Sequence, residues 1–163
     1  MEEKRHLDEV LERLRILEAK EDIREVMARY NYSVDNVDLE SLMELFLEDA
    51  VVATEQWGAF KGKKEIKAFY KRILSPTSGL YNMRHYAANP VIKIEGDEAT
   101  ETSYFHETAE YGGKAIVVAG SYEDRFKRNG TGQWRYQEKK IYLNFMVPIE
   151  GDAWAREKKV MDM

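Results

Sequence analysis

The chain has 163 residues, of which 30 are acidic and 25 basic, a net charge of −5 and no cysteine. This length suits one domain with its own hydrophobic core, and the lack of cysteine excludes disulfides and thiolate metal sites. Acidic and basic residues are mixed along the chain without a basic stripe, which argues against nucleic acid as a partner. No signal-peptide pattern and no apolar stretch of membrane-spanning length occur, so we expect a cytoplasmic protein that does not bind membranes.

The first predicted element is a helix over residues 7–30, in which apolar residues recur at helical spacing opposite a charged face. Residues 19–21 are the place where this helix could break, although neither Gly nor Pro marks it. The segment YNYSVDNVD (30–38) follows, and a second apolar stripe over residues 39–46 predicts another helix. Asp38 is placed to cap that second helix by accepting a hydrogen bond from a backbone N–H in its first turn.

The period of the apolar residues changes in the second half of the chain. Residues 49–62 predict a short pair of strands, and residues 63–74 predict a third helix. Four long alternating runs follow, separated by the turn sequences EGDE, YGGK and RNGTG; they cover residues 81–94, 98–111, 114–127 and 133–145. Helices followed by a four-stranded antiparallel meander indicate an α+β fold. Strands this long twist and bend, so we expect helices on the concave face of a cone-shaped sheet, with a deep pocket between them.

Two histidines, His85 and His106, lie on the first and second long strands. If the turn is centred on residues 96–97 and no bulge intervenes, position 85 faces position 108, and His106 lies diagonally across on the same face. The same alternation places further side chains on this pocket face, among them Met83, Ala87, Asn89, Val91, Tyr104, Thr108, Val117, Ala119 and Ser121. Pro90 predicts a bulge or an edge position in the first long strand.

The opposite face of the predicted sheet is assigned to solvent or to a subunit interface. Its side chains are Arg84, Tyr86, Lys93, Glu101, Tyr122 and Asp124. The loose turn before the fourth strand leaves open whether Lys139 or Lys140 points into the pocket.

Asp35 ends the helix that precedes it, where a carboxylate meets the negative end of the helix dipole. A protonated histidine would compensate, and an aspartate in such a pair orients the imidazole while its other nitrogen moves a proton. The alternative is that Asp35 and Asn36 simply form a turn. A third arrangement, a metal site of Asp35, His85 and His106, has no supporting local ligand spacing, so we expect no bound metal.

Four segments, residues 23–52, 57–70, 83–100 and 120–141, resemble the SnoaL-like branch of the nuclear transport factor 2-like superfamily. The resemblance covers about residues 15–146, which makes residues 1–163 a single SnoaL-like domain with an N-terminal helical extension and a C-terminal tail. It implies the cone-shaped fold with a deep pocket. The branch includes scytalone dehydratase, bile acid 7α-dehydratase and hexachlorocyclohexane dehydrochlorinase, as well as isomerases, formaldehyde-releasing lyases and members without known chemistry.

The resemblance also implies roles for particular residues. Asp35 and His85 stand at the positions of an aspartate–histidine catalytic dyad, and Tyr30 stands at the position of a tyrosine five residues before the aspartate. His106 resembles a second histidine on the next strand. Lys139 stands where a basic residue assists the leaving group, although the family has arginine there.

Together these observations predict a cofactor-independent lyase that performs a dehydratase-like elimination on a small, hydrophobic, ring-containing molecule. His85 is the predicted base, and His106 or Tyr30 the predicted proton donor. Further residues predicted to contact the substrate are Tyr32, Trp57, Asn89, Tyr104, Ser121 and Lys139. The alternatives are an isomerase or formaldehyde-releasing lyase with the same dyad, and a non-catalytic binding or assembly module. We also expect a homo-oligomer, a dimer or trimer, that covers part of the outer sheet face.

Overall fold

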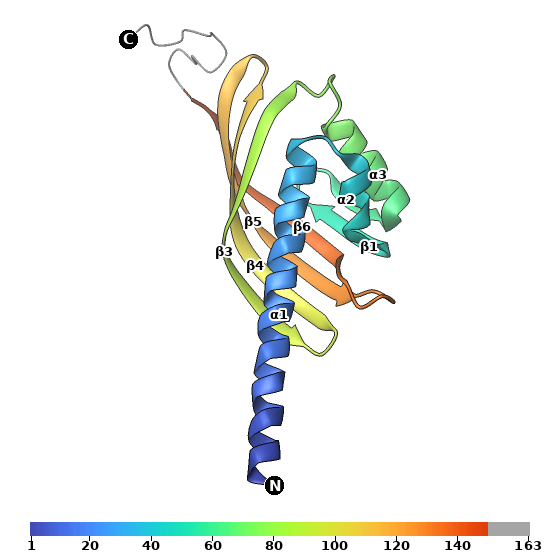
Figure 1. Ribbon diagram of the computed structural model, residues 1–163. Coiled ribbons are helices and arrows are strands. Elements are labelled where there is room, and N and C mark those ends of the chain that lie inside the picture. Colours follow the sequence, from blue (N-terminus) through green and yellow to red (C-terminus); the bar gives the residue numbers. More distant parts are fainter. Residues whose placement is uncertain (150–163) are drawn as a thin grey trace, which may run out of the picture.

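The computed structural model describes residues 1–149. Helix α1 (Glu2–Asp35) is uninterrupted, so the break considered at residues 19–21 does not occur. Its first half projects beyond the sheet with exposed leucines such as Leu7, and Ala19 is the first buried side chain (Figure 1). No helix within residues 1–149 has both the length and the apolar character needed to cross a membrane.

The short elements after α1 follow the predicted order. Helix α2 (Leu39–Glu44) is capped by Asp38, whose side chain accepts a hydrogen bond of 3.1 Å from the backbone N–H of Ser41, as predicted. The hairpin of β1 (Phe46–Thr54) and β2 (Gly58–Lys61) comes next, followed by helix α3 (Gly62–Ile73). Gly62 adopts a φ of 76°, which lets the chain turn directly from β2 into α3.

The four long strands form the antiparallel meander that the sequence predicts. They are β3 (Leu80–Glu95), β4 (Glu98–Tyr111), β5 (Lys114–Arg128) and β6 (Trp134–Pro148). The sheet is nevertheless larger than predicted: it has six strands in the order β2-β1-β6-β5-β4-β3, and β1 is parallel to β6. The sequence shows where β1 lies but contains no local signal for its partner, since a parallel neighbour is distant in the chain.

A bulge in β3 decides which side chains of the sheet face inward. Near the turn the register is the predicted one, with Lys93 opposite Thr100. Asn89 has a φ of 56°, and at residues 89–90 β3 gains one residue relative to β4. Beyond the bulge His85 therefore pairs with Glu107 instead of position 108.

The sheet curls around the second half of α1, and α2 and α3 lie over its β1 side (Figure 1). The helices and the concave sheet face together bury an aromatic-rich core. Its largest fully buried apolar side chains are Trp134, Tyr70, Tyr136, Phe46 and Phe126. The predicted α+β cone of N-terminal helices on a curved sheet is thus the observed fold. The predicted C-terminal tail from Glu150 lies outside the described residues.

Candidate active site

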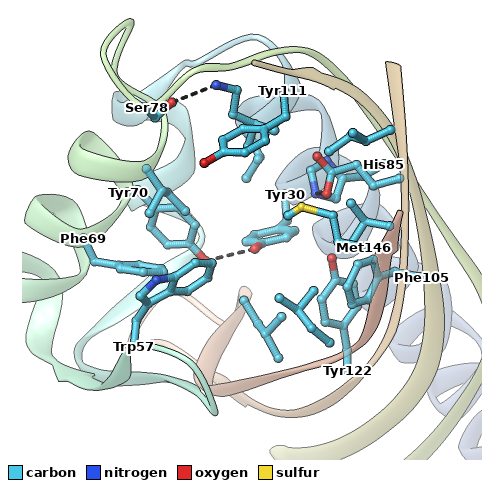
Figure 2. A pocket seen from close by; sticks show the side chains of 18 residues that line it. Tyr30, Trp57, Phe69, Tyr70, Ser78, His85, Phe105, Tyr111, Tyr122 and Met146 are labelled. Atoms are coloured by element: carbon cyan, nitrogen blue, oxygen red, sulfur yellow. Dashed lines mark hydrogen bonds and ion pairs between the residues drawn. The ribbon is translucent and has the colours of Figure 1, made fainter. Parts of the chain in front are cut away.

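A pocket of about 290 Å³ opens between α3 and the concave face of the sheet. Figure 2 shows Trp57, Phe69 and Tyr70 on one side of it, and His85, Phe105 and Met146 on the other. The remaining lining residues are mostly apolar too: Tyr30, Val34, Ile73, Ser78, Leu80, Glu107, Tyr111, Ile116, Val118, Tyr122, Ile141 and Leu143. An apolar cavity with few polar groups is the usual form of a small-molecule site, and this one lies near the lower end of the ~300–1,000 Å³ range.

Asp35 and His85 meet at the wall of this pocket. Nδ1 of His85 lies 2.6 Å from Oδ1 of Asp35, and the backbone N–H of His85 donates a 3.0 Å hydrogen bond to Oδ2. Both side chains are about nine-tenths buried. The expected pairing of Asp35 with His85 is therefore observed. Asp35 is placed to hold a proton on Nδ1, which leaves Nε2 as the nitrogen that accepts or donates a proton.

Glu107 occupies the other side of the same imidazole. Its Oε2 lies 3.3 Å from Nε2 of His85, and its side chain is only 9% exposed. Burial raises the pKa of Glu107, the charge of Asp35 raises it further, and His85 acts in the opposite direction. The imidazole is thus held between two carboxyl groups, one from the end of α1 and one from β4.

Tyrosines form the part of the pocket between α1 and the sheet. The hydroxyl groups of Tyr30 and Tyr70 share a hydrogen bond of 2.9 Å (Figure 2). Burial raises the pKa of Tyr30 well above its ordinary value, and the neighbouring Tyr70 and Tyr122 add to this rise. Phe105 stacks on Tyr122 with a centroid distance of 4.6 Å, which fixes both rings against the sheet.

Lys139 points inward, which resolves the choice between it and Lys140. It does not line the pocket, however: Nζ lies 3.0 Å from Oδ2 of Asp124, and the side chain is 1% exposed. The rings of Tyr30 and Tyr122 lie between this ammonium group and the pocket, with centroids at 4.3 Å and 3.5 Å from Nζ. The prediction that Lys139 contacts a substrate is therefore wrong.

Eight other predicted pocket residues lie outside the pocket, on the outer face of the sheet or, for Asn89, in the bulge itself. They are His106, Tyr104, Thr108, Ser121, Val117, Ala119, Asn89 and Val91. The bulge at residues 89–90 is the reason: a register change of one residue moves every facing side chain of the neighbouring strands to the opposite side. The metal-site arrangement fails with them, because His106 cannot join Asp35 and His85. Among residues 1–149, no cluster of three or more acidic or histidine side chains is arranged to hold a metal ion.

The same register change also makes part of the predicted outer face wrong. Arg84, Tyr86 and Lys93 are exposed as predicted, but Glu101, Tyr122 and Asp124 are buried on the concave side. Tyr32 is also misplaced, at 71% exposure, because a residue two positions after Tyr30 points to the opposite side of a helix. Trp57 does line the pocket, as predicted.

Sequence reasoning missed Glu107, Phe105 and Tyr122, which all line the pocket. The alternation of β4 and β5 was visible, but its phase relative to His85 depended on the bulge. Pro90 was the one signal that could have corrected the phase.

The model of the SnoaL-like domain matches residues 15–140 of this chain. The crystal structure of LinA is similar, with a TM-score of 0.79 and 20% identity, covering 85% of this chain and 95% of that one. A putative scytalone dehydratase from Novosphingobium aromaticivorans has a TM-score of 0.72 and 21% identity, covering 83% and 91%. An NTF2-like protein with a cystatin-like fold from the same species has a TM-score of 0.70 and 27% identity, covering 90% and 92%. No curated protein matches the chain.

Proposed function

Because the chain belongs to the SnoaL-like domain family, we propose that its pocket is the active site of a lyase. The reaction is a cofactor-independent elimination: a proton is removed from a small, ring-containing, largely apolar molecule, and a neighbouring group leaves. Two similar structures support this class of reaction. One carries the name hexachlorocyclohexane dehydrochlorinase and another is described as a putative scytalone dehydratase, and both names denote eliminations.

The Asp35–His85 pair at the pocket wall is the observation that carries the proposal. Two hydrogen bonds from His85 to Asp35 fix the orientation of the imidazole. The Asp35 carboxylate also stabilises the imidazolium that forms when Nε2 takes a proton. The mostly apolar lining makes the surroundings of His85 less polar than water, which strengthens these electrostatic effects inside the site. The aromatic side chains Trp57, Phe69 and Phe105 offer flat surfaces for a ring.

Replacement of His85 by Gln tests the proposal. A panel of hydroxylated bicyclic ketones suits the pocket, because loss of water next to a carbonyl creates a conjugated product that is followed by ultraviolet absorbance. His85→Gln keeps polarity and approximate size but removes the base, so the rate falls by roughly a hundredfold to ten-thousandfold. Asp35→Asn causes a similar loss, and the double variant loses little more than either single one, because the two residues act as one unit.

His106→Gln is the matched control. It is the same substitution one strand away, but on the outer face of the sheet, so turnover stays at the wild-type rate. Two results would sink the proposal: equal losses in the His85 and His106 variants, or a double variant whose loss is the product of the two single losses.

The mass of the product separates the lyase from the other reactions open to the same dyad. Loss of water indicates elimination, an unchanged mass indicates isomerisation, and loss of formaldehyde indicates carbon–carbon cleavage. Binding of panel compounds without turnover would instead identify a non-catalytic binding module.

A further inference from the structure

Glu107 lines the pocket and has one buried oxygen without a hydrogen-bond partner among the described residues. It lies directly opposite His85 in the β3–β4 register, with Oε2 facing Nε2 of the imidazole. Its other oxygen, Oε1, is buried and has no hydrogen-bond partner among the described residues. A buried carboxylate oxygen without a partner is costly while the group is charged, which favours the neutral, protonated form of this carboxyl group.

The groups around Glu107 favour a proton on its carboxyl group. Asp35 lies beyond the imidazole, and the rings of Phe105 and Tyr122 line the same part of the pocket. Burial is the main cause that raises the pKa of Glu107; His85 lowers it, and Asp35 raises it by a smaller effect. A role for Glu107 as a proton donor requires that one proton serve the His85–Glu107 pair, held by Glu107 while His85 carries only the proton on Nδ1 that faces Asp35.

Elimination of a hydroxyl group needs a proton donor, since hydroxide is a poor leaving group. The two donors predicted from the sequence do not fit this role. His106 lies on the outer face, and the hydroxyl group of Tyr30 is committed to Tyr70 with its pKa raised well above the ordinary value. Glu107 lines the pocket and is in contact with the base.

We propose that Glu107 is the general acid of this site, which gives its proton to the oxygen that leaves and regains it from His85. This assignment rests on the elimination proposed above. In the reaction, Nε2 of His85 takes the proton from carbon, and the electrons of that C–H bond form the new double bond. The C–O bond breaks, and the proton of Glu107 completes the water molecule. The imidazolium then passes its proton to the Glu107 carboxylate, 3.3 Å away, so the pair returns to its starting state without solvent.

The first test uses the protein without substrate. In selectively ¹⁵N-labelled wild-type protein at neutral pH, the His85 signal, assigned by its loss in His85→Gln, shows a proton on Nδ1 and none on Nε2. The infrared difference between wild type and Glu107→Gln shows the carbonyl stretch of a protonated carboxyl group. Glu98→Gln, the same substitution at an exposed position of β4, shows no such band. A doubly protonated His85 would overturn the proposal, because Glu107 would then be ionised and have no proton to give.

The second test compares two leaving groups on one bicyclic ketone: a hydroxyl group, which must be protonated, and a chloride, which leaves as an anion. Glu107→Gln slows loss of the hydroxyl group by roughly a hundredfold to ten-thousandfold but leaves loss of chloride almost unchanged. Equal slowing of both would refute the acid role of Glu107, whereas His85→Gln slows both. If His85→Gln slows neither, the elimination itself is wrong, and that failure is distinct from a failure of Glu107 alone.

Discussion

Gly120 of β5 is predicted to be irreplaceable, because a methyl group there has no space. A Cβ built at this position lies 2.1 Å from the carbonyl oxygen of Tyr142 on β6 and 2.5 Å from Cε1 of Phe105 on β4. Real Cβ contacts are never this short. The ring of Phe105 is itself held by its stack on Tyr122, so it cannot move aside freely.

The expected cost of Gly120→Ala follows from these contacts. Overpacking a core by one methyl group costs about 1–3 kcal/mol, and the upper end applies because the closest atom belongs to the backbone and cannot rotate away. For a protein of this size, about 3 kcal/mol lowers the thermal midpoint by roughly 6–12 °C. The displacement of Phe105 also narrows the pocket, so compounds that bind the wild-type pocket bind the variant more weakly.

Thermal unfolding followed by circular dichroism measures the effect. Gly130→Ala is the matched control, because a Cβ at Gly130 meets no atom within 4 Å and φ there is not positive. Its free energy of unfolding should stay within about 0.5 kcal/mol of the wild-type value. Equal midpoints for the two variants would refute the close packing of β5 between β4 and β6.

Three further predictions concern charge, capping and assembly. Burial raises the pKa of Glu101 to about 7; the folded state therefore holds an extra proton between about pH 4.3 and 7, so stability falls as pH rises through this window, and Glu101→Gln removes that part of the slope in denaturant titrations. Asp38→Ala removes the cap of α2 and lowers the free energy of unfolding by about 1 kcal/mol in urea titrations. Light scattering should give the mass of a dimer or trimer, and Tyr86→Glu with Tyr104→Glu should lower it, because both tyrosines are exposed on the outer sheet face; a wild-type monomer would contradict this.

The sequence predicts the elements of this fold well because each has a local cause. The cap of α2 needs only Asp38, and short glycine-containing segments form the turns after β3 and β4. The pairing of β1 with β6 has no such cause, since it joins segments some ninety residues apart. The possible break at residues 19–21 had no local signal either, and the helix continues there with Ala19 and Ile23 buried.

The candidate site shows where sequence reasoning reaches its limit. Asp35 was visible because a carboxylate at a helix C-terminus needs compensation, and the family resemblance supplied His85 as its partner. The remainder depended on one backbone residue, Asn89, whose positive φ shifts the register by one. That shift places Glu107 instead of His106 beside the imidazole. The proton donor predicted from the sequence is thus replaced by the one proposed from the structure.

The buried pair of Lys139 and Asp124 supports a last prediction about the tyrosines of the pocket. Lys139 is 1% exposed and Asp124 is fully buried, with Nζ and Oδ2 3.0 Å apart. Removing one charge from a buried pair costs about 3–5 kcal/mol, because the other charge remains without compensation, whereas apolar replacement of both is often neutral or stabilising. Lys139→Met should therefore lower the free energy of unfolding by about that amount in urea titrations.

The double variant Asp124→Leu with Lys139→Met decides between two roles of the ion pair. Either the pair stabilises the folded state, or each charge only offsets the cost of burying the other. Its unfolding free energy should return close to the wild-type value, since no buried charge of the pair is left. The ammonium group also lies 3.5 Å from the Tyr122 ring and 4.3 Å from the Tyr30 ring, and these cation–π contacts disappear in both variants. The alternative result is that the double variant loses as much unfolding free energy as Lys139→Met and Asp124→Leu together. Each residue then contributes to stability independently of the other. In that case the loss in Lys139→Met would come from its contacts with the tyrosine rings and not from an uncompensated charge on Asp124.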